Sequence, residues 1–324
     1  MANYVVSDIS LGSVADAIRT KGGTSAPLTY PQGFIDAIDA ISGGGDEPIP
    51  EDGKTRIWIH IAEDTPDNRL TFYLRFTASV ANNTTVDWGD GVSETLGSTT
   101  ATNYSHKYAE GGDYVIAMTV NSGTITFKGT SGSNGYSIYG ARATNNYHNR
   151  SRIQKVIIGD NITSIGDYAF YNCYSLTSIT IPDGVISIGT YTFYCCYALV
   201  SITIPDSVTS IGQNVFYGCY VLTSIVIPDG VISIIGSAFQ YCFGITSITI
   251  PDNVTNIGAN AFGYCYSVSE YHFKPTTPPT LANSNAFNNI PSDCIIYVPQ
   301  GSLDAYQQAT NWSQFSSKMQ EEPV

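Results

Sequence analysis

Charge is scarce in this sequence of 324 residues: Asp, Glu, Lys and Arg make up only 13% of it, about half of the usual share. The formal net charge is −13, which argues against nucleic acids and anionic membrane surfaces as partners. No Lys or Arg stands between Lys155 and Lys274. The acidic residues in that span are Asp160, Asp167, Asp183, Asp206, Asp229, Asp252 and Glu270.

Segments that direct a chain into or across a membrane are also missing. The start, MANYVVSDISLGS, has no basic region followed by an apolar one, so we do not expect a signal peptide. No apolar run approaches the roughly 18 to 20 residues of a membrane-spanning helix. We therefore expect no insertion into a membrane.

Catalytic patterns are absent as well. The four histidines, His60, His106, His148 and His272, are scattered without the spacing of metal ligands. The sequence contains no Gly-rich phosphate loop, nucleophile elbow or pairs of cysteines with zinc-site spacing. We expect no enzyme, no catalytic or metal-binding residues and no cofactor.

What the sequence does contain is a tandem repeat of 23 residues over positions 157–273. Proline recurs every 23 residues, at Pro182, Pro205, Pro228 and Pro251. Cysteine recurs in the same way at Cys173, Cys196, Cys219, Cys242 and Cys265, and phenylalanine at Phe170, Phe193, Phe216, Phe239 and Phe262. Such a period predicts a solenoid.

Each coil should contain one short strand. Ile179 and Ile181 alternate with polar residues and should point inward, and Pro182 ends the strand because it cannot donate a backbone hydrogen bond. One coil alone cannot be stable, because its buried side chains contribute ~1.5–3 kcal/mol each while ordering costs ~1–2 kcal/mol per residue. Neighbouring coils are therefore obligatory.

The coil V-x-S-I-G-x-x-x-F-x-x-C, followed by L-x-S-I-x-I-P-D, resembles the BspA-like leucine-rich repeat family of bacterial surface proteins. The resemblance covers residues 155–315. Phe287 follows Phe262 by 25 residues, which indicates a sixth, shifted coil. We expect a C-terminal cap sealed by Leu303, Tyr306, Trp312 and Phe315, and a tail over 316–324.

Residues 55–128 alternate like strands and predict a β-sandwich. This segment resembles immunoglobulin-like domains of the polycystic-kidney-disease (PKD) type, on the residues Val86-Asp87-Trp88-Gly89-Asp90-Gly91, His106-Lys107-Tyr108 and Gly112-Asp113-Tyr114. The resemblance implies a core Trp, a tight Gly-Asp-Gly turn and a spacer or weak binder. Asp87, Asp90 and His106 also allow a metal site, but Asp-Gly at a turn needs no metal.

The remaining segments connect or precede these two. Residues 1–42 predict two short amphipathic helices and resemble an N-terminal segment of phage tail proteins, on AIRTKGGT and PQGFIDAIDAI. They could be a weakly ordered terminus or an attachment segment that binds other tail proteins or trimerises. Residues 43–54 predict a linker, and residues 129–154 predict a loop or N-terminal cap over the first coil.

The cysteines allow two interpretations. Stacked strands would place equivalent cysteines ~4.8 Å apart, within the Cα range of a disulfide. Side chains in register point the same way, however, so we expect buried free thiols. Cys195 lies just before the repeated cysteine position and could be exposed.

The candidate binding residues are aromatic side chains next to the repeated cysteine. They stand one residue after it, two residues before it or, for Tyr241 and Tyr264, one residue before it. They could simply stack along the solenoid, or form a binding surface for sugar rings or proteins. The positions around Phe and Cys vary between coils, by diversification or by drift. The candidate residues are Tyr171, Tyr174, Tyr194, Tyr197, Tyr217, Tyr220, Tyr241, Phe243, Tyr264 and Tyr266.

The sequence therefore predicts a mainly β protein with a helical N-terminal segment, an immunoglobulin-like sandwich and a leucine-rich-repeat solenoid. The favoured function is receptor binding by a phage tail protein, located in the virion, with a cell-surface glycan or protein as partner. One alternative is an extracellular bacterial adhesin of the BspA-like class. Another is a structural tail or baseplate spacer.

Overall fold

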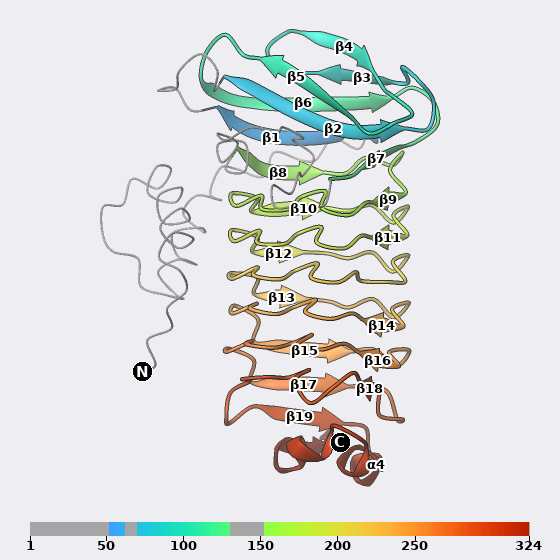
Figure 1. The fold of residues 1–324 in the computed structure, drawn as a ribbon, viewed down its shortest axis with the longest axis vertical. Helices are drawn as coiled ribbons and strands as arrows, with labels where there is room; N and C mark the ends of the chain where they lie inside the picture. Colours follow the sequence, from blue (N-terminus) through green and yellow to red (C-terminus); the bar gives the residue numbers. More distant parts are fainter. Residues whose placement is uncertain (1–51, 62–69, 130–151, 324) are drawn as a thin grey trace, which may run out of the picture.

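A computed structural model describes residues 52–61, 70–129 and 152–323. Its coils stack into a tall solenoid with a two-sheet β region at one end and a short helix at the other (Figure 1). The helices expected in residues 1–42 lie outside the described residues, as do most of the expected linker and of segment 129–154.

Residues Thr55–Phe127, here called the N-terminal β region, form two sheets. One contains β1, β6, β3 and β4, and the other contains β7, β2 and β5. These strands alternate between buried and half-buried residues, as in β1, because successive side chains point to opposite faces. The bounds are β1 (Thr55–Ile61), β2 (Thr71–Ala78), β3 (Thr84–Asp87), β4 (Ser93–Leu96), β5 (Thr102–Lys107), β6 (Gly112–Val120) and β7 (Ile125–Phe127).

The Trp-Gly-Asp-Gly turn is held by side-chain hydrogen bonds. Trp88 is fully buried, its indole Nε1 donates to Glu94 (3.0 Å), and its carbonyl accepts from the Tyr108 hydroxyl (2.9 Å). His106 Nε2 lies 2.6 Å from Asp90 Oδ2. Among the described residues no group of three or more His, Cys, Asp or Glu could hold a metal ion.

The N-terminal β region is joined to the solenoid by both of its sheets. Strand β1 pairs antiparallel with β8 (Ile153–Ile157), the first strand of the solenoid. Strand β7 pairs in parallel with β9 (Ser164–Ile165) on the other side of the same coil. The first coil is therefore covered by the N-terminal β region, and the cap suggested for residues 129–154 falls mostly outside the described residues.

The solenoid strands line two sides of each coil. Strands β8, β10, β12 and β13 continue the sheet of β1, and β15, β17, β19 and β20 form a second sheet after them. The bounds on this side are β10 (Ser178–Thr180), β12 (Ser201–Ile202), β13 (Ser224–Ile225), β15 (Ser247–Ile250), β17 (Glu270–Phe273) and β19 (Ile295–Val298). The other side carries β11 (Ser187–Ile188), β14 (Ser233–Ile234), β16 (Asn256–Ile257) and β18 (Thr280–Leu281).

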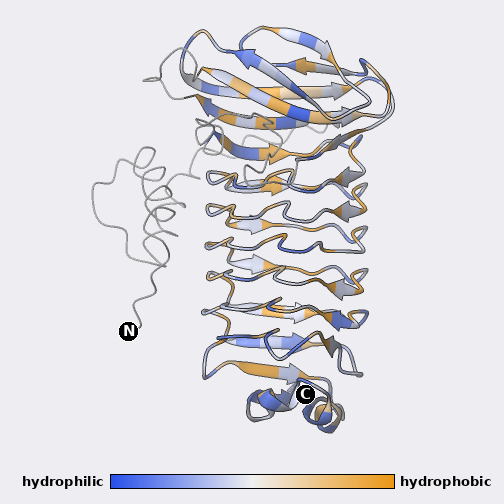
Figure 2. Cartoon of the chain, in the orientation of Figure 1, coloured by the Kyte–Doolittle hydropathy of each residue, from blue (hydrophilic) through white to orange (hydrophobic). Residues whose placement is uncertain are grey.

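Parallel pairing keeps the 23-residue register, so that Ser178 lies beside Ser201 and Ile179 beside Ile202. The predicted solenoid is confirmed. The apolar positions of the repeat are buried in the core of the coils, and Figure 2 shows apolar residues recurring along the stacked coils. The repeated phenylalanines form a stacked column in this core, with ring centroids 5.3–5.5 Å apart from Phe170 to Phe287.

The repeated glycine lets adjacent coils approach each other. A Cβ atom on Gly189 would lie 2.5 Å from the Asp167 backbone nitrogen, and one on Gly258 would lie 2.4 Å from that of Gly236. Real Cβ atoms do not come this close, so these positions require glycine.

The C-terminal end is closed by α4 (Leu303–Gln308) and the 3₁₀ helix η2 (Ser313–Lys318). Tyr306 and Trp312 are fully buried and donate hydrogen bonds to the carbonyls of Pro275 and Pro279 (both 2.7 Å). Residues 316–324 were expected to be a tail, but Met319–Glu321 form β20, which pairs with β19. None of the helices in the described part is long and apolar enough to cross a membrane.

Candidate functional site

The candidate tyrosines lie where each coil leads into its strand of the β8–β20 side. The first column, one residue after the repeated cysteine, contains Tyr174, Tyr197, Tyr220, Phe243 and Tyr266. Successive ring centroids are 5.0, 4.7, 5.0 and 5.4 Å apart, and the ring planes differ by at most 21°. These rings stack face to face along the solenoid.

The second column begins two residues before the cysteine. Tyr171, Tyr194 and Tyr217 stack at 5.0 and 4.7 Å. The next two coils have no tyrosine at that position, and the column passes to the following residue. Tyr217 meets Tyr241 edge-on at 5.2 Å, and Tyr241 stacks on Tyr264 at 4.7 Å.

Two further tyrosines belong to this site and were not among the sequence candidates. Tyr168 stacks on Tyr191 at 5.0 Å, and both rings contact the second column through Tyr171 and Tyr194. Their only signal in the sequence is a shared position two residues before the repeated phenylalanine. Together these twelve residues form what we call the aromatic surface.

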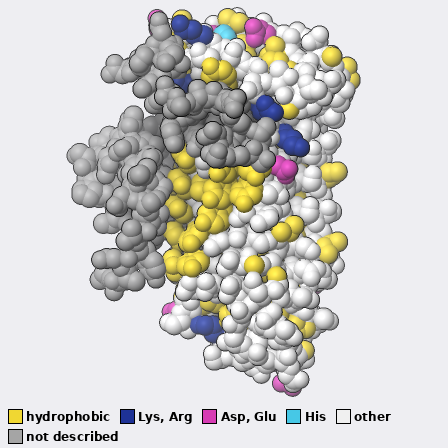
Figure 3. Space-filling view, viewed as in Figure 1, with side chains coloured by type: hydrophobic (Ala, Val, Ile, Leu, Met, Phe, Trp, Pro, Cys, Tyr) yellow, Lys and Arg dark blue, Asp and Glu magenta, His cyan; other side chains and the backbone are white. Residues whose placement is uncertain are grey.

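Figure 3 shows hydrophobic side chains gathered along one side of the solenoid. Tyr174, Tyr194, Tyr217 and Tyr220 are partly buried and pack around a small cluster that is separate from the main core. That cluster consists of Cys195, Tyr197, Ala198 and Val221. The aromatic surface therefore has an apolar base of its own.

Four residues of the aromatic surface and several of their neighbours have a left-handed backbone. The position two residues after the repeated phenylalanine has positive φ in six coils, at Asn172, Cys195, Gly218, Tyr241, Tyr264 and Asn289. The position two before it does so in five, at Tyr168, Tyr191, Asn214, Ser237 and Asn260. Gly and Asn suit this conformation, whereas for most other residues it costs ~1–2 kcal/mol. The positions that vary between coils are thus mostly the left-handed ones.

Burial differs along the aromatic surface. Tyr197 and Phe243 are 7% and 6% exposed, and most of the other rings are half-buried. Cys195 is also buried, at 7% exposure, so the suggestion that it is exposed was wrong. Its thiol lies 3.2 Å from where a Cβ atom on Gly218 would be, which shows that it fills the space between coils.

Burial also raises the pKa of several of these phenols. It raises the pKa of Tyr217 to about 12, with the neighbouring Tyr241 and Cys195 adding to the effect. Burial, followed by the nearby Cys195, likewise raises the pKa values of Tyr194, Tyr197 and Tyr220. The pKa of the Cys195 thiol rises to about 12 because it is buried. The aromatic surface therefore carries neutral hydroxyl groups at physiological pH.

The ring orientation limits the chemistry of this surface. Because the faces stack on each other, a ligand alongside the columns meets ring edges and phenol hydroxyls. Aromatic edges are the positive part of the ring quadrupole, and each hydroxyl can donate and accept a hydrogen bond. The arrangement suits a neutral ligand rich in hydrogen-bonding groups. Stacking of sugar rings on open tyrosine faces, which the sequence suggested, is not available along the columns.

The repeated cysteines are structural. All are buried and free, and four donate a hydrogen bond from Sγ to the carbonyl oxygen of the phenylalanine in the preceding coil. Cys196 reaches Phe170 at 3.2 Å, and Cys219 reaches Phe193 at 3.3 Å. Cys242 and Cys265 repeat the contact. The cysteine thus joins adjacent coils as well as filling the core.

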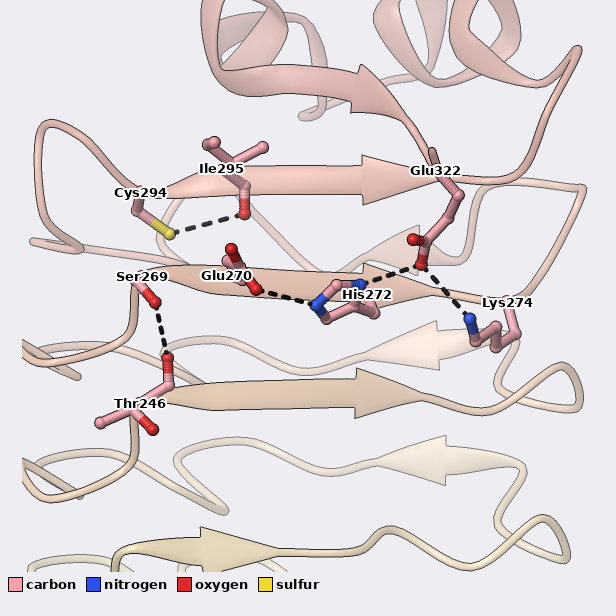
Figure 4. Close-up of polar contacts among 8 residues, drawn as sticks. All are labelled: Thr246, Ser269, Glu270, His272, Lys274, Cys294, Ile295 and Glu322. Atoms are coloured by element: carbon pink, nitrogen blue, oxygen red, sulfur yellow. Dashed lines mark hydrogen bonds and ion pairs between the residues drawn. The ribbon is translucent and has the colours of Figure 1, made fainter. Parts of the chain in front are cut away.

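A polar cluster separate from the aromatic surface lies near the C-terminal end (Figure 4). His272 Nδ1 lies 2.9 Å from Glu322 Oε1, and its Nε2 lies 3.3 Å from Glu270 Oε2. Lys274 also contacts Glu322, at 3.3 Å. Burial raises the pKa of Glu322, but the hydrogen bonds from His272 and Lys274 outweigh it, so the pKa is lowered overall. This cluster fastens the chain end after β20 to β17.

The fold defined by these coils is a leucine-rich-repeat solenoid with an aromatic surface. Residues 143–269 match the BspA type leucine-rich repeat region, in six copies. The repeat region is therefore of the BspA type, as its sequence indicated. The match leaves out residues 55–128, so the PKD resemblance of that segment stays a prediction. No curated protein matches the chain.

Several solved structures are similar to part of the chain. A leucine-rich repeat protein from Bacteroides ovatus is 34% identical over 54% of this chain and 45% of that protein, with a TM-score of 0.41. A leucine-rich cell surface protein from Faecalibacterium prausnitzii is 31% identical over 49% and 52%, with a TM-score of 0.36. The pneumococcal vaccine antigen PcpA is 20% identical over 53% and 42%, with a TM-score of 0.44. The chain spans about half the length of these proteins.

Proposed function

We propose that this protein is a non-enzymatic binding protein of the adhesin kind, which acts at a cell surface and binds its receptor through the aromatic surface. Two findings support this. The repeat region is of the BspA type, and outside its buried phenylalanine column it carries stacked aromatic columns around a separate apolar cluster.

The observation that carries the proposal is the backbone of Tyr241 and Tyr264. Both have left-handed φ values, 63° and 62°, at a position where the other coils have Asn172, Cys195, Gly218 and Asn289. They stand in the two coils that have Gln240 and Gly263 in place of the column tyrosine. The column is thus continued by bulky residues in an unfavourable conformation, and strain retained in this way points to function rather than to stability.

Stacking for stability alone is the competing explanation. The phenylalanine column already stacks in the core over the same coils, and the coils are also joined by backbone and thiol hydrogen bonds. The two columns of the aromatic surface, which lie outside this core, are not required to hold the coils together. We therefore favour binding.

The test compares binding of the full chain and two variants to bacterial and host cells. Tyr174→Ser, Tyr197→Ser and Tyr220→Ser together should remove most of the binding. The matched control carries Ile186→Ser, Val226→Ser and Ile232→Ser, which are exposed apolar residues elsewhere on the solenoid (59%, 71% and 55%). Circular dichroism and thermal melting check that both variants are folded. Full binding by the folded tyrosine variant would refute the proposal.

A phage tail protein, with residues 1–42 attached to other tail proteins or trimerised, stays a prediction from sequence. Those residues lie outside the described part. The same holds for a structural tail spacer, which the cell-binding experiment would favour if neither cell type binds the unaltered chain.

A further inference from the structure

Building on the proposed function, we propose that the ligand of the aromatic surface is a neutral polysaccharide of extended, β-1,4-linked sugars. The polysaccharide would lie along the solenoid axis, with about one sugar ring beside each coil. Three properties of the surface lead to this ligand class: the repeat distance, the groups that it presents and its lack of charge.

The repeat distance is short and nearly constant. Successive ring centroids of the first column are 4.7–5.4 Å apart. The ring centroids of the stacked pairs in the second column are 4.7–5.0 Å apart. In an extended β-1,4-linked chain each pyranose ring advances by about the same distance. Successive rings are turned over, so alternate ring edges face successive tyrosines, and both edges carry hydroxyl groups that can pair with a phenol, which donates and accepts. Side chains on one face of an extended polypeptide recur only every ~6.6 Å, because two residues of ~3.3 Å separate them. A polypeptide along this axis would lose register within a few coils.

The presented groups are aromatic ring edges at this same spacing, and every ring of the two columns except Phe243 carries a hydroxyl. Tyr194, Tyr217 and Tyr220 are half-buried, so their rings are fixed while part of each side chain reaches the surface. Fixed rings lose little rotational freedom on binding, which favours affinity. Each phenol can both donate to and accept from a sugar hydroxyl.

The charge distribution excludes acidic polymers. Residues 156–273 contain no Lys or Arg, so an anionic polysaccharide would meet no cation on these coils. The acidic residues of the same coils would repel it. A cationic polymer has acidic side chains available, but four of them follow Pro182, Pro205, Pro228 and Pro251 at the opposite end of each strand from the tyrosines. Asp167 beside Tyr168 and Glu270 at the start of β17 are the acids on the tyrosine side. The coils between them leave the aromatic surface for a neutral ligand.

The experiment measures binding of the full chain by calorimetry to soluble oligosaccharides of increasing length. The probes are β-1,4-linked glucose and N-acetylglucosamine oligomers, α-1,4-linked glucose oligomers and the anionic β-1,4-linked polymer carboxymethyl cellulose. We expect affinity only for the neutral β-1,4-linked oligomers, rising with oligomer length until the oligomer spans the five rings of the first column. Equal binding of the α-linked oligomers or of carboxymethyl cellulose would overturn the proposal.

Variants that retain the aromatic rings but lose hydroxyl groups distinguish this inference from binding by a general apolar surface. Tyr217→Phe with Tyr220→Phe removes two hydroxyls and preserves stacking, and should weaken oligosaccharide binding by roughly 10- to 100-fold, at ~3- to 10-fold per lost hydrogen bond. The matched control is Tyr73→Phe with Tyr297→Phe, two half-buried tyrosines outside the surface, which should change nothing. Unchanged binding by the first variant contradicts the hydroxyl mechanism.

The outcomes also separate this proposal from the one on which it rests. If the full chain binds cells through the tyrosines but binds no neutral β-1,4-linked oligomer, the adhesin function stands and the ligand class is wrong. If the serine variant binds cells as well as the unaltered chain does, the surface has no binding function and both proposals fail.

Discussion

At the scale of single residues, conformation and burial distinguish the tyrosines from ordinary surface residues. Tyr168, Tyr191, Tyr241 and Tyr264 all have φ between 57° and 63°, which suits Asn or Gly better. Tyr197 is buried beside Cys195. Such residues are held in place before any ligand arrives, which reduces the entropy lost on binding.

Alkaline pH should destabilise the solenoid through these phenols. An unfolded tyrosine ionises near pH 10, while burial raises the pKa of folded Tyr217 to about 12. The unfolded chain therefore loses the proton first, so stability is unaffected below pH ~10 and falls as the pH rises from about 10 to 12. Urea unfolding at several pH values measures the decline. Tyr217→Phe should lessen it, and an equal decline in that variant would show that Tyr217 does not contribute.

At the scale of elements, the N-terminal β region and the first coil share both sheets. Strand β8 has β1 on one side and β10 on the other. The Gly159 backbone N–H donates to the Thr55 hydroxyl (2.9 Å), and the buried Arg152 donates to the Thr71 carbonyl (2.8 Å). These contacts complete a coil that would otherwise expose an unpaired strand edge.

A fragment of residues 150–324 should therefore be unstable on its own. Its β8 edge and the Phe127 side of the Phe170 ring would be uncovered, and an exposed edge promotes aggregation. We expect the fragment to aggregate or to melt at least several degrees below the full chain. The control is a fragment that begins at residue 52, which retains β1 and β7 and should melt like the full chain. Equal melting of both fragments would show that the solenoid folds independently.

At the scale of the whole molecule, charge is concentrated away from the aromatic surface. The chain carries a net charge of −13, yet residues 156–273 have no basic residue. Binding through this surface cannot depend on ion pairs contributed by Lys or Arg of these coils. Apolar contacts and neutral hydrogen bonds remain, and salt screens neither of them.

Cell binding should accordingly be almost independent of salt. Between ~0.05 and ~0.5 M sodium chloride the Debye length falls several-fold, but we expect the affinity to change by less than about two-fold. Titration of labelled cells with the full chain at each salt concentration measures this. A steep loss of affinity with salt would indicate an electrostatic interface elsewhere on the molecule.

The sequence alone determined the repeat, its 23-residue register and the inward Phe, Ile and Cys positions, because these follow from periodicity and side-chain alternation, and its resemblance to the BspA-like family indicated the leucine-rich-repeat class. It also identified the Tyr174 and Tyr171 columns, since each repeats beside Cys173 at a constant offset. Three features depended on tertiary structure. Strand β1 completes the first coil, β20 adds the last strand, and Tyr241 and Tyr264 continue the column from left-handed positions. Pairing partners distant in sequence and the sign of φ leave no periodic trace, so only the folded chain shows them.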